Sequence, residues 1–291
     1  MKILVTGASG LLGKKVYSIA SRRHEVVGTY FSNKSSNSLI RFSLSNLEEI
    51  KPFLDLHKPQ AIIHTASLTD VNLAEQSAPL AKLVNGDATL ALASWCEQNE
   101  ARLIYISTDY VFDGETGPYD EFSTPYPVQI YGFTKFLGEM MLREHKGGAV
   151  VRVGILHGFN DQYDKTTVTT QVVKALKSGE TLAMDHGRIK YPTLIDDVAE
   201  GLLHVSEEGL SGIFHLCGSE GLTRYEWGVR VADVFKLDSS RLIPDPNKER
   251  DLWPRRPKEV KLLDTLLNFK HHDIESSLLL LRKQMTEAKA I

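Results

Sequence analysis

Short apolar runs alternate with longer amphipathic stretches along the first half of the chain. Uninterrupted apolar runs predict buried strands, and apolar residues at helical spacing predict helices. This alternation predicts an α/β fold with a parallel, doubly wound sheet, whose ligands bind beyond the carboxyl ends of the strands. The expected strands are 3–5, 26–27, 61–63, 103–106 and 149–151. The expected helices are 11–22, 47–56, 80–99 and 131–145.

The alternation loosens after about Arg152, where a polar stretch covers 160–167. We therefore expect a first domain at 1–156 and a smaller C-terminal lobe at 157–291, with about 194–217 returning to the first domain. The pattern of this lobe predicts helices at 168–177, 196–206 and 225–235, and two final helical patterns after a Pro- and charge-rich segment at 244–257.

Composition favours a small-molecule role. The 291 residues carry 34 Lys and Arg against 37 Asp and Glu, a net charge of −3, with no strongly basic stretch to attract nucleic acid or a membrane surface. Cys96 and Cys217 form no CxxC pair, and none of the ten histidines lies in a strong metal-ligand pattern, so we expect no metal site. With no signal-type or membrane-spanning apolar run, we expect a cytoplasmic protein.

A glycine-rich loop, TGASGLLG at 6–13, follows the first strand and opens the first helix. Glycines allow unusual backbone angles and close approach of a phosphate, while the helix N-terminus supplies oriented N–H groups. The pattern therefore predicts a Rossmann-like domain that binds the pyrophosphate of a dinucleotide. A nucleotide-hydrolysing P-loop is excluded, because Ala8 and Lys15 stand where that motif needs Gly and Ser or Thr.

The end of the second strand bears on the choice of dinucleotide. An acidic residue there would hold the ribose hydroxyls of NAD, but VVGTYFSNK contains none. Ser32, Asn33 and Lys34 could accommodate a 2′-phosphate. We therefore expect a preference for NADP(H), with NAD(H) left open.

Three polar side chains could converge on one substrate. Tyr131 and Lys135, in YGFTK, lie one turn apart on an expected helix, and Thr108 ends the strand that precedes it, in STDYVFDG. Hydride reduction of a ketone leaves negative charge on oxygen and needs a proton donor. Free tyrosine has a pKa of about 10, which a nearby ammonium would lower. Tyr131 is the expected acid, Lys135 its modulator, and Thr108 a hydrogen-bond donor to the substrate.

These motifs resemble the extended short-chain dehydrogenase/reductase family, and STDYVFDG with YGFTKFLGE is similar to its dTDP-4-dehydrorhamnose reductase group. The resemblance implies a catalytic set of Thr108, Tyr131 and Lys135. It implies substrate contacts at Thr108, Asp109 and Ile155, where the group commonly has Trp in place of Ile155. The implied cofactor contacts are Gly7, Gly10, Leu11, Leu12, Gly13, Phe31, Ser32, Ser43, Leu44, Ala66, Ser67, Leu68, Tyr131 and Lys135.

The activity that this resemblance implies is NADPH-preferring reduction of the C4 ketone of a deoxysugar nucleotide, as in dTDP-L-rhamnose formation. Several downstream stretches, including GIFHLCGSE, are also similar to the beta regulatory subunit of methionine adenosyltransferase, which implies an NADP-binding partner of another enzyme instead. A nucleotide-sugar epimerase or dehydratase is a third alternative. A homodimer through the helices after the third and fourth strands is also compatible with the sequence.

Overall fold

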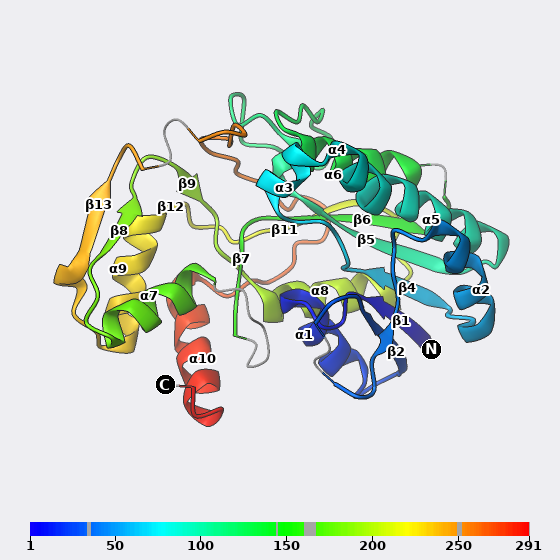
Figure 1. Cartoon of the computed structure of the whole chain (residues 1–291), viewed down its shortest axis with the longest axis horizontal. Helices are drawn as coiled ribbons and strands as arrows, with labels where there is room; N and C mark the ends of the chain where they lie inside the picture. Colours follow the sequence, from blue (N-terminus) through cyan, green and yellow to red (C-terminus); the bar gives the residue numbers. More distant parts are fainter. Residues whose placement is uncertain (34–35, 144, 160–166, 249–251, 291) are drawn as a thin grey trace.

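A computed structural model describes residues 1–33, 36–143, 145–159, 167–248 and 252–290. Lys34 and most of the polar stretch at 160–167 lie outside these ranges. The described chain forms a sheet domain and a smaller lobe beside it (Figure 1). Within the described residues, no helix has the length and apolar character needed to cross a membrane.

A seven-stranded sheet forms the core of the larger domain, in the order β11-β6-β5-β4-β1-β2-β3. All its neighbouring strands pair in parallel. The order reverses between β1 and β4, as in doubly wound nucleotide-binding folds, which confirms the expected fold class. The strands are β1 (Lys2–Thr6), β2 (Glu25–Tyr30), β3 (Ile40–Arg41), β4 (Ala61–His64), β5 (Arg102–Thr108), β6 (Gly148–Val153) and β11 (Gly212–Leu216).

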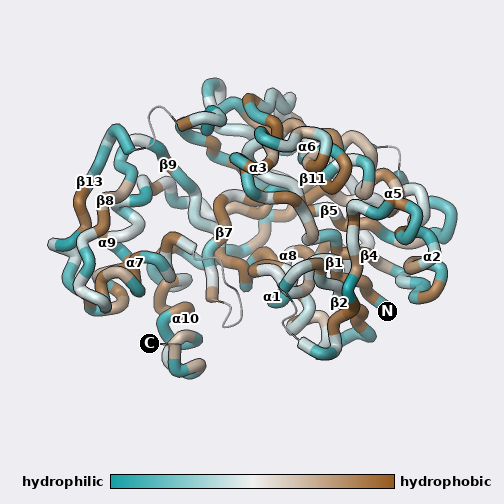
Figure 2. The backbone as a smooth tube through the Cα atoms, viewed as in Figure 1, coloured by the Kyte–Doolittle hydropathy of each residue, from teal (hydrophilic) through white to brown (hydrophobic). Residues whose placement is uncertain are grey.

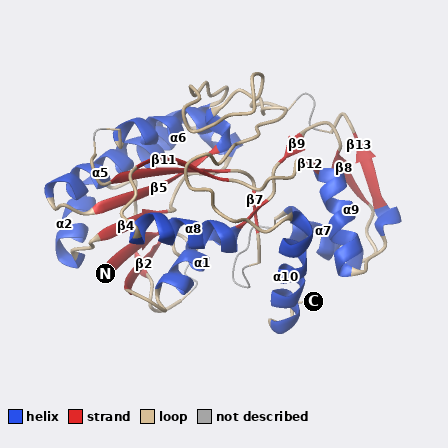
Figure 3. Cartoon of the chain, turned by 180° about the vertical axis from the view of Figure 1, so that it is seen from behind, coloured by secondary structure: helices blue, strands red, loops and turns tan. Residues whose placement is uncertain are grey.

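Helices cover both faces of this sheet (Figures 1 and 3). One apolar cluster joins the sheet to α1 and α8, and a second joins the opposite face to α2 and α5. The strands are correspondingly apolar along their length (Figure 2). The helices of this domain are α1 (Leu11–Ala20), α2 (Leu47–His57), α3 (Val71–Gln76), α4 (Ala78–Lys82), α5 (Ala88–Gln98), α6 (Ile130–Met141) and α8 (Ile195–Glu207).

The smaller lobe has its own apolar core around the fully buried Trp227. Its helices are α7 (Val168–Lys177), α9 (Arg224–Phe235) and α10 (Ile274–Glu287). Paired short strands complete it and connect it to the sheet domain: β8 (Leu182–Asp185) with β13 (Leu242–Asp245), β9 (Ile189–Lys190) with β12 (Leu222–Thr223), and β7 (Leu156–His157) with β10 (Thr193–Leu194).

The expected helices differ from the structure mainly in three parts of the chain. The helix expected at 80–99 is divided by a π-helical turn at Leu83–Asp87, between α4 and α5. The helix expected at 131–145 ends at Met141. The two final helical patterns yield one helix, α10, in the described residues after Pro257. Around 260–263 the backbone instead pairs with Tyr119, because the buried side chains of Val260 and Leu262 alternate as in a strand.

Close packing joins α6 to the end of β5. A Cβ on Gly132 would overlap the Tyr110 carbonyl, which follows β5. A Cβ on Gly138 would overlap the Tyr105 hydroxyl and lie 2.7 Å from the Asn85 carbonyl oxygen. The two glycines therefore set how near the helix lies to the strand, and with it the position of every side chain on that face of α6.

This packing predicts that Gly138→Ala destabilises the fold by about 1–3 kcal/mol through overpacking, despite the better helix propensity of alanine. Gly86→Ala is the matched control, because its Cβ would have no neighbour nearer than 3.6 Å. Urea unfolding of both variants measures the difference. Equal stabilities for Gly138→Ala and wild type would show that the packing is looser than described.

Candidate active site at the carboxyl edge of the sheet

The glycine-rich loop is built for close backbone approach. Gly7 has φ +67°, and a Cβ there would lie 2.9 Å from the Ala66 Cα. A Cβ on Gly13 would overlap the Gly7 carbonyl. The Ala8 N–H donates to the Thr29 carbonyl at 2.7 Å, which ties the loop to β2. The loop thus presents main chain at the start of α1, the arrangement that suits a pyrophosphate.

The other expected cofactor residues follow neighbouring strands at the same edge of the sheet. Phe31, 59% exposed, and Ser32 come directly after β2, and Ser43 and Leu44 follow β3. Ala66, Ser67 and Leu68 follow β4, beside Gly7. Leu12 and Leu44 are buried in the apolar clusters, so any contact that they make with a cofactor involves little of their side chains.

Asn85, in the π-helical turn, connects this edge to α6. It is 1% exposed, and its Oδ1 accepts from the Ser67 hydroxyl at 2.8 Å and the Leu68 N–H at 2.9 Å. Its Nδ2 donates to Thr134 Oγ1 at 3.1 Å. No role of Asn85 was expected from the sequence. The signal that could have found it is a polar residue beside a glycine within an otherwise apolar helical pattern.

Thr108 and Tyr131 meet at the end of β5. Burial raises the Tyr131 pKa well above its usual value, and the neighbouring Thr108 hydroxyl opposes this rise only in part. The net shift is therefore opposite to the lowering expected from Lys135. Tyr110 packs edge-on against Tyr131 with ring centroids 6.1 Å apart. Tyr131 is consequently a protonated phenol, able to donate its hydrogen.

Lys135 lies one turn further along α6, with its Nζ 4.0 Å from the centroid of the Tyr105 ring. Burial lowers the pKa of Lys135 to about 7. His64, on β4, is buried beside it and shares a 2.7 Å hydrogen bond with Thr6, and its pKa is lowered to about 3 by burial and by Lys135. His64 is thus a neutral structural residue.

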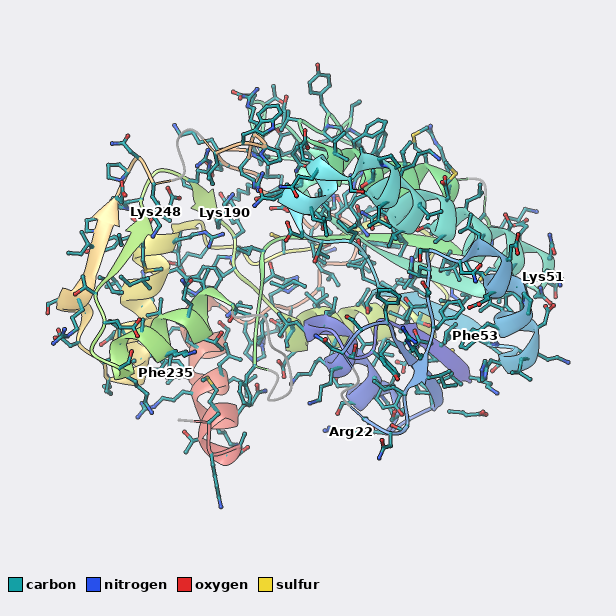
Figure 4. All side chains as sticks on the ribbon, viewed as in Figure 1. Arg22, Lys51, Phe53, Lys190, Phe235 and Lys248 are labelled. Carbon is teal, nitrogen blue, oxygen red and sulfur yellow. The ribbon has the colours of Figure 1, made fainter. Side chains whose placement is uncertain are left out.

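Asp109 faces a cation from the second lobe. Its Oδ1 accepts from the Thr108 hydroxyl at 3.0 Å, and burial raises its pKa to about 6 against the opposing charge of Lys190. Lys190 is 6% exposed and comes from β9, at the side of the second lobe next to the sheet domain (Figure 4). Its Nζ lies 5.6 Å from the centroid of the Tyr110 ring. Lys190 could not be singled out from the sequence, because only the fold brings it to this edge.

Other singled-out residues have structural partners. Ile155 packs against the core of the second lobe, and its carbonyl accepts from the Thr193 N–H. Asp70 caps α3, and Asp113 accepts from the Tyr119 hydroxyl, so both carboxylates are held by local hydrogen bonds. Among the described residues, no group of three or more His, Cys, Asp or Glu side chains is placed to hold a metal ion.

A buried ion pair lies behind the catalytic candidates. Glu139, on α6, accepts from Arg152 Nη2 at 2.7 Å and from Arg152 Nε at 3.0 Å. It also accepts from the Ser107 hydroxyl. Ser107 therefore supports the exit of β5 from behind, while its neighbour Thr108 faces Tyr131.

The parallel sheet, the glycine-rich loop and the Thr108, Tyr131 and Lys135 arrangement together define the class: an extended short-chain dehydrogenase/reductase fold. The model described as the RmlD substrate binding domain matches residues 1–276, and the chain belongs to that family. A dTDP-4-dehydrorhamnose reductase from Clostridium acetobutylicum is similar in structure, with a TM-score of 0.86, 26% identity and coverage of 98% of this chain and 100% of that one.

Two relatives that are similar in sequence are named for different functions. Methionine adenosyltransferase 2 subunit beta of Danio rerio is 32% identical over 283 residues, covering 95% of this chain and 87% of that protein. The probable low-salt glycan biosynthesis reductase Agl14 of Haloferax volcanii is 31% identical over 264 residues, covering 89% and 88%. The family thus contains proteins named as reductases and proteins named as subunits of another enzyme.

The Asp109 and Lys190 arrangement predicts a measurable titration. Removing the cation by Lys190→Met raises the Asp109 pKa above about 6, because Lys190 favours the ionised carboxylate. Carboxyl ¹³C chemical shifts followed against pH report the midpoint, and Asp113 is the internal control. An unchanged Asp109 midpoint in the variant would contradict the pairing.

Proposed function

We propose that the protein is a cytoplasmic, NADPH-preferring reductase of the C4 ketone of a deoxysugar nucleotide. The observation that carries this proposal is the placement of Tyr131 beside Thr108, one helical turn from Lys135 and at the same sheet edge as the glycine-rich loop. Buried free thiols at Cys96 and Cys217 suit a reducing compartment. The proposal divides the work between a dinucleotide-binding domain, at 1–156 with about 194–217, and a substrate-binding lobe formed mainly by 157–291.

The dinucleotide fits the chain because Gly7 and Gly13 leave a cradle that a Cβ would fill. When bound, it supplies the hydride. Tyr131 donates its phenolic proton to the ketone oxygen as negative charge develops there, and Thr108 donates a hydrogen bond that orients the same oxygen. Lys135 holds the nicotinamide ribose and stabilises the phenolate that Tyr131 becomes.

The 2′-phosphate preference gains support from Arg41, which the sequence analysis did not consider. Arg41 is exposed and pairs in register with Tyr30, the last residue of β2. Its Nε donates to the Phe31 carbonyl at 3.4 Å. A guanidinium beside the end of β2, next to Ser32, suits a phosphate monoester on the adenosine ribose.

The 32% identity to a methionine adenosyltransferase subunit over 95% of the chain favours a second candidate, an NADP-binding regulatory partner. Under this alternative, the same cradle binds the cofactor, and no sugar is reduced. The two candidates differ in turnover, so kinetics separates them.

The reductase proposal predicts that purified protein oxidises NADPH in the presence of dTDP-4-dehydro-6-deoxy-L-mannose. Tyr131→Phe removes the proton donor and lowers kcat by about 10²–10⁴-fold, while NADPH binding persists. Loss of nicotinamide absorbance measures the rate. Tyr126→Phe, which alters a loop tyrosine that is 71% exposed, is the control and retains activity. Absence of turnover by wild type, together with co-purification of a methionine adenosyltransferase, would favour the regulatory alternative instead.

If Arg41 contacts the 2′-phosphate, its removal changes the affinity for NADPH and not the affinity for NADH. Arg41→Ala weakens NADPH binding by about 10–100-fold, the loss expected for charge-assisted hydrogen bonds, and leaves NADH binding unchanged. Fluorescence titration with each cofactor measures both affinities. Equal losses for the two cofactors would contradict a 2′-phosphate contact.

A further inference from the structure

Glu139 is a buried acid one helical turn beyond Lys135. It is 5% exposed, and its oxygens accept three hydrogen bonds, two from Arg152 and one from the Ser107 hydroxyl. A buried carboxylate is costly unless it is paired, so this pairing keeps a negative charge inside the protein next to α6. Tyr131, Lys135 and Glu139 follow one another at intervals of four residues and therefore share one face of the helix.

The partners of Glu139 connect it to the rest of the site. Ser107 precedes Thr108 on β5. Arg152 lies 5.0 Å from the centroid of the Phe112 ring, and its Nη1 lies 3.4 Å from His215 Nε2. His215 Nδ1 lies 2.9 Å from the Leu263 carbonyl, which only accepts, so Nδ1 carries the hydrogen and Nε2 faces the guanidinium. Burial and Arg152 lower the His215 pKa to about 4, so this histidine is neutral.

The groups around Lys135 differ in how they affect its charge. Tyr105 presents its ring face to Nζ, and burial raises the Tyr105 pKa well above its usual value, so that phenol is neutral. His64 is neutral too, and Tyr131 is a protonated phenol. Glu139 is the acid whose charge opposes the effect of burial on the Lys135 pKa. The ammonium form of Lys135 therefore depends on Glu139.

We propose that Glu139 is a positioning residue, which keeps Lys135 as an ammonium and holds α6 against the strand that ends in Thr108. One carboxylate thereby links all three catalytic candidates: Thr108 through Ser107, and Tyr131 and Lys135 through the helix. The inference rests on the proposed function where it concerns reduction. Its electrostatic part applies to any nicotinamide cofactor that Lys135 contacts.

The test is the pH profile of Glu139→Gln, which keeps the shape of the side chain and removes its charge. Because Lys135 then loses its proton at lower pH, the alkaline fall of kcat/KM moves to lower pH than in wild type. Above the wild-type midpoint, kcat/KM drops by about tenfold, the factor that one unit of pKa shift produces. At mildly acidic pH, where Lys135 is protonated in both proteins, the variant recovers wild-type kcat/KM.

Two further variants are measured in the same experiment. Glu121→Gln is the matched control, because Glu121 is 4% exposed, accepts from the Thr265 N–H and hydroxyl, and is not among the groups that shift the Lys135 pKa. Its pH profile matches that of wild type. The double variant Glu139→Gln/Arg152→Gln also removes the guanidinium, which the single variant leaves buried without its carboxylate partner. It therefore replaces the single variant if that protein fails to fold. It shows the same displaced profile.

NADPH affinity, measured by fluorescence across the same pH range, separates this inference from the proposed function. If wild type binds NADPH but reduces no sugar nucleotide, the reductase proposal fails, and the affinity profile alone decides the role of Glu139. A midpoint displaced to lower pH in the variants supports that role. A loss of the same size at every pH, or profiles that superimpose on wild type, overturns it.

Discussion

The contact between α6 and the end of β5 is the constraint on which the candidate site depends. Thr108 ends the strand, and Tyr131 and Lys135 lie on the first turns of the helix, so the distance between the two elements sets the distances between their groups. Gly132 and Gly138 permit this approach because a Cβ at either would overlap a neighbour. Since protein interiors are close-packed, a small shift of the helix would reach all three side chains.

Most of the sheet domain could be predicted from the sequence, because buried strands leave uninterrupted apolar runs and the glycine-rich loop occurs in a strand-to-helix context. The π-helical turn at Asn85 could not be predicted, because one extra residue in a single helical turn hardly changes the spacing of the apolar residues. The rule that ligands meet parallel strands at their carboxyl ends predicts that Thr108 and Tyr131 belong to one site, and in the structure the two residues are neighbours. The raised Tyr131 pKa was missed, because burial arises from packing between distant segments.

Charge at this edge of the sheet comes from both parts of the molecule. The sheet domain contributes Lys135 with Glu139 behind it, and the second lobe contributes Lys190 opposite Asp109. The first pair lies on the helix that carries Tyr131, and the second joins the end of β5 to β9 of the second lobe. The chain's relatives include a protein named as a reductase and one named as a subunit of another enzyme.

The proposed function depends on hydride transfer at this edge of the sheet. The most direct measurement uses NADPH labelled with deuterium on one face of C4 of the nicotinamide, and locates the label in the sugar product by NMR. Both singly labelled forms are tested. If the proposed function is right, one of the two labelled forms of NADPH delivers deuterium to C4 of the sugar. A product with no deuterium from either form, with the label kept by the cofactor in both cases, would contradict hydride transfer at this site.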